Sequence, residues 1–233
     1  MSADTRPPGH EGMPDWLAEL PERAARVPEH EFSRFLAHEH SDAKESAVLI
    51  LFGPGPSAGP GHGAPGAPGA GPEGVELVVT ERAHTMRSHA GQAAFPGGRR
   101  EPQDRDLIAT ALREAEEEIG LVPASVEVVT TLPVLHLPVS DHDVLPVVGW
   151  WREPGPVGVR DPAEVERVVQ VGLPHLLDPA HRFSVRHPSG YVGPAFDAHG
   201  LVVWGFTAGL LDATLRLAGL DMPWDPSVYR ELP

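Results

Sequence analysis

The chain lacks cysteine, which excludes disulfide bonds, thiolate nucleophiles and cysteine-based zinc sites. It also lacks any run of about 18 apolar residues, the length that would cross a bilayer as a helix. Residues 1–17 have neither the basic region nor the apolar segment of a secretory signal peptide. These absences predict a soluble, cytoplasmic protein with no membrane partner.

Basic side chains are scarce, because 18 lysines and arginines face 33 aspartates and glutamates, giving a formal net charge of −15. This acidity argues against general binding to nucleic acid, whose backbone is also negative. A group of basic residues is nevertheless close together in the sequence: Arg82, Arg87, His89, Arg99 and Arg100. A local basic patch in an acidic protein favours a small anionic ligand, so we expect a small-molecule substrate.

The length of 233 residues suits one domain with a substantial core and an appendage. Residues 15–38 hold helical patterns interrupted by Pro21 and Pro28, and we interpret residues 1–44 as an N-terminal helical appendage. Residues 53–74 are almost wholly glycine, proline and alanine, which predicts a flexible loop inside a domain of residues 45–233. The appendage could close a pocket, cap a sheet or form the surface of a homodimer.

The remaining patterns alternate between strands and helices. A cap at Asp161 followed by Pro162 predicts the start of a helix or a turn at residues 161–166. Strands are predicted at residues 47–52, 75–80, 126–132 and 144–151 and within 191–207, and a closing apolar helix at residues 206–217. This order predicts an α/β fold, with an α/β/α sandwich around a mixed β-sheet.

The most informative segment is residues 97–121, GGRREPQDRDLIATALREAEEEIGL. Four apolar residues recur at helical spacing within it: Ile108, Leu112, Ala115 and Ile119. This spacing predicts an amphipathic helix with one apolar face. Gly120 is the expected end of the helix.

Glu114, Glu117 and Glu118 share another face of this predicted helix, near its negative end. Repulsion between them should cost about a few tenths of a kcal/mol per pair. A bound divalent cation would relieve this repulsion, and ligands that are all oxygens favour Mg²⁺ or Mn²⁺ over zinc. Glu116 lies off this stripe, and we interpret it as solvated. The alternative is a solvated acidic face without a metal.

Residues 113–121, REAEEEIGL, resemble the core of the Nudix hydrolase box. The upstream half differs from the common pattern, because Gly98 and Asp104 lie one residue further from Arg113 than the box glycine and its first glutamate. The loop is thus one residue longer, and Asp104 replaces a glutamate. The resemblance implies the Nudix fold and an enzyme that hydrolyses a nucleoside diphosphate linked to another group.

The resemblance also implies roles for the carboxylates. Glu114, Glu117 and Glu118 would hold Mg²⁺ or Mn²⁺, together with the backbone carbonyl of Gly98. The metal would neutralise pyrophosphate oxygens and lower the pKa of the attacking water. Glu114 and Glu117 are therefore expected to be catalytic as well as metal-binding.

The proton-transfer group is a separate question. Arg113 cannot be a base because its pKa is above about 12, so we expect it to orient a neighbouring glutamate. A glutamate beyond the box supplies the base or a further metal ligand in many relatives of this family. We favour Glu164 over Glu166 for this role. The alternative is that Glu164 is only a charge near a helix N-terminus.

A second motif, VTERAHTMRSHAGQAAFPGG at residues 79–98, resembles the signature of coenzyme A pyrophosphatases within the Nudix superfamily. It implies hydrolysis of coenzyme A or its derivatives to 4′-phosphopantetheine and 3′,5′-adenosine bisphosphate. The substrate-binding residues that it implies are Arg82, Arg87, His89, Gly91 and Phe95. Two alternatives stay open: a Nudix hydrolase for NADH or ADP-ribose, and a catalytically silent domain that senses a nucleotide.

Overall fold

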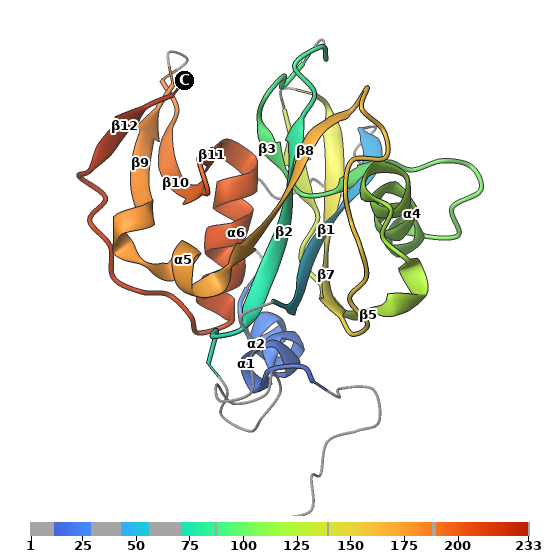
Figure 1. Cartoon of the computed structure of the whole chain (residues 1–233), viewed down its shortest axis with the longest axis horizontal. Helices are drawn as coiled ribbons and strands as arrows, with labels where there is room; N and C mark the ends of the chain where they lie inside the picture. Colours follow the sequence, from blue (N-terminus) through green and yellow to red (C-terminus); the bar gives the residue numbers. More distant parts are fainter. Residues whose placement is uncertain are drawn as a thin grey trace, which may run out of the picture.

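The computed structural model describes residues 12–28, 43–55, 71–86, 88–138, 140–187 and 190–232. These residues form a mixed sheet with helices on both faces and a second, smaller sheet beside one of the helices (Figure 1). This arrangement confirms the predicted α/β fold and its α/β/α sandwich. Among the described helices, none has the length and apolar character needed to cross a bilayer.

The main sheet has eight strands, with the central order β3-β2-β1-β7-β5. Strand β4 pairs with β1, β6 with β7, and β8 with β2. The β1–β7 pair is parallel and its neighbours are antiparallel, so the sheet is mixed. The strands are β1 (Lys44–Pro54), β2 (Val75–Arg82), β3 (Ala93–Ala94), β4 (Gly97–Arg99), β5 (Val126–Thr131), β6 (Leu135–Leu137), β7 (His142–Trp151) and β8 (Val165–Gly172).

The helices divide between the two faces of this sheet (Figure 1). One face carries α4 (Leu107–Ile119), whose apolar side packs on β1 and β7. The other face carries α6 (Gly205–Leu217), α1 (Asp15–Ala18) and α2 (Leu20–Arg26), which enclose the larger core. Shorter helices are α5 (Leu173–Leu177), η1 (Pro123–Ser125) and η2 (Pro179–His181).

The second sheet has the order β11-β10-β9-β12 and packs beside α6 (Figure 1). Its strands are β9 (Arg182–Arg186), β10 (Val192–Ala198), β11 (Leu201–Val203) and β12 (Tyr229–Glu231). Thr207 of α6 donates a hydrogen bond to the carbonyl of Ala93 in β3 at 3.0 Å. This contact ties the C-terminal part of the chain to the main sheet.

The N-terminal helices belong to the larger core. Met13, Leu17 and Leu20 are fully buried, and the Trp16 ring meets Phe52 of β1 edge-on with centroids 5.5 Å apart. Of the roles left open by the sequence, these contacts correspond to a cap over the sheet. Residues 1–11 and 29–42 of the expected appendage lie outside the described residues.

Two local predictions have different outcomes. The strands on either side of residues 53–74 pair with each other, Leu51 opposite Val78, as expected for an insertion between paired strands; residues 56–70 of this loop lie outside the described residues. The helical option at residues 161–166 is wrong. Asp161 accepts a hydrogen bond from the amide of Ala163 at 2.8 Å in a turn, and β8 begins at Val165.

Candidate active site

Helix α4 positions the acidic residues of the candidate site. It begins after Asp106, whose side chain accepts a hydrogen bond from the Ala109 amide at 2.8 Å and caps the helix. It ends at Gly120, which has a φ of 74° and a left-handed conformation, as predicted. Ala115 and Ile119 of the predicted apolar face are fully buried, so the helix is fixed in rotation about its axis.

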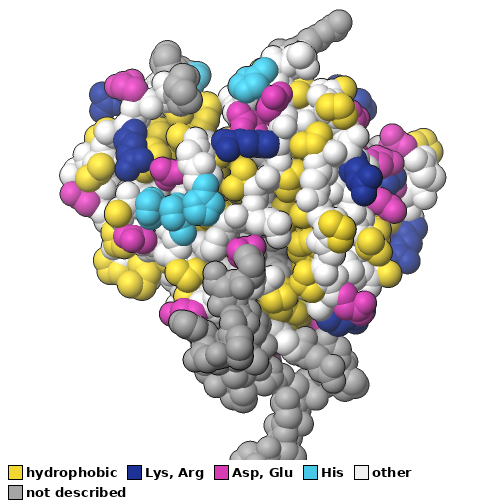
Figure 2. All heavy atoms as spheres, in the orientation of Figure 1, with side chains coloured by type: hydrophobic (Ala, Val, Ile, Leu, Met, Phe, Trp, Pro, Cys, Tyr) yellow, Lys and Arg dark blue, Asp and Glu magenta, His cyan; other side chains and the backbone are white. Residues whose placement is uncertain are grey.

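The three carboxylates expected to bind metal have different environments. The side chain of Glu114 is 13% exposed and that of Glu117 is 57% exposed. Glu118 is 4% exposed. Glu116 is exposed, in agreement with its expected solvation. Acidic and basic side chains gather at the edge of the molecule over α4 (Figure 2).

Glu118 is the most deeply placed acid of the site. Its Oε2 accepts a hydrogen bond from the Gly97 amide at 3.1 Å, which links α4 to β4. The pKa of Glu118 is raised to about 8, chiefly by burial; the Gly97 amide and Arg82 oppose this rise, and the negative charges of Glu114 and Glu164 contribute to it. These electrostatic effects mean that residues from β2, α4 and the turn before β8 meet here.

Gly98 lies against the carboxylate of Glu114. A Cβ atom built on Gly98 would lie 2.5 Å from the carboxyl carbon of Glu114, so only glycine leaves room for this carboxylate. Strand β4 holds Gly98 in place by pairing it with Ala47 of β1. Burial raises the pKa of Glu114, although the adjacent Arg113 lowers it.

Arg113 connects the acidic residues. Its Nη2 donates to Glu114 Oε1 at 3.0 Å and to the carbonyl of Arg99 at 2.9 Å, and its Nη1 donates to Glu117 Oε2 at 2.8 Å. Nε and Nη2 also bind the two oxygens of Asp104 at 2.9 and 3.0 Å, a bidentate pair. Arg113 therefore fixes the orientation of both glutamates, the kind of role expected from its high pKa.

Asp104 holds Arg113 in turn. It is 7% exposed and accepts further hydrogen bonds from the Glu101 amide and the Thr110 hydroxyl, each at 2.9 Å. The hydrogen bonds from Arg113 hold the pKa of Asp104 well below its usual range. Asp104 lies where the family pattern has a glutamate, and its hydrogen bonds fix the position of Arg113.

Glu164 and Arg82 lie near the carboxylates, because the charge of Glu164 acts on Glu114 and Glu118 and that of Arg82 acts on Glu118. The Ala83 amide donates to the Glu164 carbonyl at 2.8 Å, next to a register shift between Glu81 and Arg82 in the β2–β8 pair. Glu164 is exposed, and its charge raises the pKa of both Glu114 and Glu118. Arg82 Nε is buried and has no hydrogen-bond partner among the described residues.

The other residues of the signature segment differ in their surroundings. His89 has a φ of 57° and its Nδ1 lies 2.8 Å from Gln92 Oε1, while Gly91 has a φ of 68° that suits glycine. Phe95 is 3% exposed in the larger core, where its side chain packs instead of facing a ligand. Arg87 lies outside the described residues.

The donor set fits Mg²⁺ or Mn²⁺, because its side-chain ligands are all oxygen atoms. Burial raises the pKa of Glu114 and Glu118, and a nearby divalent cation would favour their ionised forms. Across the described ranges, no group of three acidic or histidine side chains already converges on one metal position. Arg113 holds oxygens of both Glu114 and Glu117, so a cation would share or displace these contacts.

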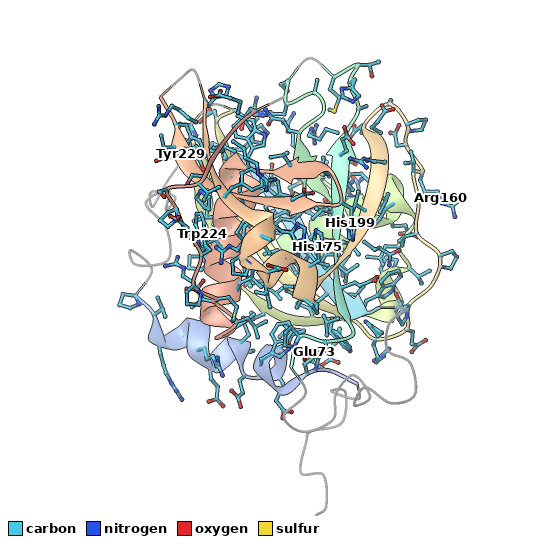
Figure 3. All side chains as sticks on the ribbon, turned by 60° about the vertical axis from the view of Figure 1, so that its left-hand side comes forward. Glu73, Arg160, His175, His199, Trp224 and Tyr229 are labelled. Carbon is cyan, nitrogen blue, oxygen red and sulfur yellow. The ribbon has the colours of Figure 1, made fainter. Side chains whose placement is uncertain are left out.

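The loop before β8 closes the C-terminal end of α4. The Arg160 amide donates to the Glu118 carbonyl at 2.9 Å, and a Cβ on Gly120 would lie 2.5 Å from Arg160 Nε. Arg160 is on the outer edge of the molecule (Figure 3). This loop therefore continues from the end of α4 toward Glu164 and fixes the spacing between them.

The site thus consists of one acidic helix on a mixed sheet, with a glycine-containing strand packed against its carboxylates. Known proteins share this arrangement of sequence and structure. The family model NUDIX domain matches residues 69–188, a range that includes all the candidate site residues. The chain is 34% identical over 196 residues to the uncharacterized Nudix hydrolase NudL of Salmonella paratyphi B, covering 78% of this chain and 90% of that protein. The chain therefore belongs to the NUDIX family.

Two further similar proteins are as follows. The NudL protein of Salmonella typhimurium gives the same 34% identity over 196 residues, with 78% and 90% coverage. A solved MutT/nudix family protein from Enterococcus faecalis has 12% sequence identity and a TM-score of 0.47, covering 84% of this chain and 71% of that one.

Proposed function

We propose that this protein is a metal-dependent pyrophosphohydrolase that cleaves coenzyme A or its derivatives to 4′-phosphopantetheine and 3′,5′-adenosine bisphosphate. The observation that carries this proposal is the placement of Arg82. Its Nε has no hydrogen-bond partner in the described part of the chain, and its charge acts on Glu118. A guanidinium with an unpaired donor beside the acidic residues is suited to bind a phosphate oxygen of a pyrophosphate.

Each residue of the site has a separate role in the proposed hydrolysis. A bound Mg²⁺ or Mn²⁺ would neutralise the pyrophosphate oxygens and make a water molecule more acidic. Glu114, Glu117 and Glu118 would hold this cation, with the Gly98 carbonyl as a further oxygen ligand, and Arg113 keeps the first two in position. Glu164 is exposed near the buried acids and takes the proton of the attacking water.

The choice of coenzyme A rests on the signature segment. His89 and Gly91 lie on the loop between β2 and β3, where the Gly91 amide donates to the Arg82 carbonyl at 3.0 Å; Arg87 lies between Arg82 and His89 in the sequence. A loop that is rich in basic residues, beside a pyrophosphate site, suits a substrate with a phosphate in addition to its pyrophosphate. Coenzyme A carries such a phosphate on the ribose 3′ position, whereas NADH and ADP-ribose do not.

The test is a parallel product assay with the purified protein and Mg²⁺ or Mn²⁺. Coenzyme A, 3′-dephospho-coenzyme A, NADH and ADP-ribose are offered separately, and the products are separated by chromatography. We expect the fastest hydrolysis with coenzyme A and release of 3′,5′-adenosine bisphosphate. Preference for NADH or ADP-ribose would discard the coenzyme A proposal, and binding without hydrolysis of any of them would favour a nucleotide sensor.

A further inference from the structure

Strand β8 carries an extra residue where it passes the end of β2 (Figure 1). Along most of their length these two antiparallel strands pair in one register, which ends with Glu81 opposite Arg167. The next pair is Arg82 with Val165, so Glu166 is left out of the pairing. This irregularity is a β-bulge, a feature that re-aims the side chains beside it and is frequent next to active sites.

The bulge determines where Glu164 lies relative to β2. The Ala83 amide donates to the Glu164 carbonyl at 2.8 Å, and the charge of Glu164 acts on the acidic residues of α4. Without the extra residue, the regular register would place Glu164 opposite His84 instead. A slip of one residue also turns each side chain to the other face of a sheet. The bulged register is therefore the one in which Glu164 reaches the acidic site.

An ion pair joins the two strands directly beside the bulge. Arg167 Nε donates to Glu81 Oε2, and these two residues are the last pair of the regular register. The Glu81 side chain is 14% exposed, so water screens this ion pair less than one on the open surface. The other carboxylate oxygen, Oε1, lies 3.3 Å from His84 Nε2. Glu81 thus links β8 to the start of the loop between β2 and β3.

The segment before the bulge is an exposed turn. The amides of Glu164 and Val165 both donate to the Asp161 carbonyl, at 3.2 and 2.9 Å, which fixes the internal shape of the turn. Residues 162–164 are exposed, so little packing holds this turn against the rest of the molecule. Its position relative to the acidic residues therefore depends on how β8 is anchored at the bulge.

We propose that Glu81 and Arg167 are positioning residues, whose ion pair locks the bulge and thereby holds Glu164 at the acidic site. This inference rests on the proposed function, in which Glu164 takes the proton of the attacking water. Glu81 alternates along β2 with Leu77 and Val79, which lie in the larger core, so the ion pair is on the sheet face opposite α4. The pair therefore acts through the backbone and does not contact the substrate.

Steady-state kinetics with the best substrate of the parallel assay test this role. Arg167→Ala should lower kcat about tenfold or more and leave KM nearly unchanged, because a small displacement of the proton acceptor slows the chemical step. Arg167→Lys keeps the charge and should recover most of the lost turnover. Gln170→Ala, which removes an exposed side chain from the same strand, is the matched control and should keep full activity.

A double variant separates positioning from a general effect on the fold. Because Arg167 acts through Glu164, Arg167→Ala should cause little further loss of kcat in a protein that already carries Glu164→Gln. Losses that multiply in the double variant would mean that Arg167 acts independently of Glu164. That result, or full activity of Arg167→Ala alone, would overturn the proposal.

Amide hydrogen exchange measured by NMR tests the lock without any turnover. In Arg167→Ala, the Ala83 amide should exchange about fivefold faster or more, because its hydrogen bond to the Glu164 carbonyl opens more often. The Leu132 amide, which donates to the Pro146 carbonyl at 2.9 Å, is the control and should be unaffected. Equal acceleration at both amides, or none at Ala83, would overturn the lock.

The two proposals can fail separately. A protein that hydrolyses none of the four nucleotides would reject the proposed function, while exchange at Ala83 would still decide whether the ion pair locks the bulge. Hydrolysis of coenzyme A with unchanged exchange at Ala83 would keep the function and reject the lock.

Discussion

At the scale of single residues, the site depends on how Arg113 distributes its donors. One guanidinium binds Asp104, Glu114 and Glu117, so both glutamates have fixed orientations before any cation binds. Glu117 is the most exposed of the three acids expected to bind metal, with 57% of its side chain accessible. It is thus the residue that can be changed with the least effect on the core.

Glu117→Gln should lower turnover by roughly a hundredfold or more, because the amide is a poor ligand for Mg²⁺ and no longer carries charge. The melting temperature should change little, since the side chain is exposed. Steady-state kinetics and thermal unfolding measure both effects. The control is Glu116→Gln, an exposed neighbour that should keep full activity; equal activity of both variants would remove Glu117 from the metal site.

Glu118 gives the site a pH dependence. Its pKa is raised from 4.5 to about 8 by burial, so between these values the folded protein keeps a proton that the unfolded chain releases. Stability of the metal-free protein from this residue is therefore present below about pH 4.5 and is lost as the pH rises through about 8. A cation binds the ionised form, so metal binding should strengthen over the same range.

We therefore expect Mg²⁺ or Mn²⁺ to raise the melting temperature more at about pH 9 than at about pH 6. Differential scanning fluorimetry with and without metal across this range measures the difference. Glu118→Gln should flatten the dependence, because the amide does not titrate. A metal effect that is independent of pH in the unmodified protein would contradict the placement of Glu118 at the metal site.

Asp104 illustrates what the sequence could not determine at this scale. The spacing of the acidic stripe predicted Glu114, Glu117 and Glu118 as a group, but it left the role of Asp104 undetermined. Its role depends on a contact across nine residues, from a loop to the middle of α4. Because the loop is one residue longer than in the family pattern, the spacing of residues could not predict this contact.

At the scale of elements, the close approach of β4 to α4 is the feature on which the site depends. Gly98→Ala should weaken metal binding at least about tenfold, because its Cβ would occupy the space of the Glu114 carboxylate. The fold should persist, since the substitution displaces a side chain that is partly exposed. Isothermal titration with Mn²⁺ measures the loss, and Gly155→Ala, where a Cβ meets no atom within 4 Å, is the control. Unchanged affinity would show that Glu114 does not bind the metal.

Prediction of elements from the sequence succeeded where a single pattern dominates. The 3.6-residue period and Gly120 located α4, the uninterrupted apolar run at residues 47–52 located β1, and the strand pattern of VELVVT at residues 75–80 located β2. Strand β8 was missed, because the proline and the acidic residues before Val165 indicated a helix start as well as a turn. Strand β12 was missed because its three residues are all exposed and carry no alternating pattern.

At the scale of the whole molecule, the N-terminal helices close the larger core. The sequence could only describe residues 1–44 as an appendage, because the described helices α1 and α2 pack on strands and helices distant in sequence. Leu17 is fully buried in the same core as Phe52 and Leu211. Truncation of Leu17 should therefore destabilise the entire domain.

Leu17→Ala should lower the free energy of unfolding by about 2–5 kcal/mol, the usual cost of truncating a buried leucine. Glu22→Ala on α2 is the control; its exposed ion pair with Arg26 should contribute less than about 1 kcal/mol. Urea denaturation of both variants measures the difference. A Leu17→Ala variant as stable as the unmodified protein would mean that the helices are an independent appendage.

The most direct measurement is mass spectrometry of the products formed from coenzyme A, with Mg²⁺ or Mn²⁺, by the unmodified protein and by Glu117→Gln side by side. We predict 4′-phosphopantetheine and 3′,5′-adenosine bisphosphate from the unmodified protein only with metal present, and largely intact coenzyme A from the variant. Intact coenzyme A in both reactions, or release of 3′-dephospho-coenzyme A, would contradict cleavage of the pyrophosphate at this site.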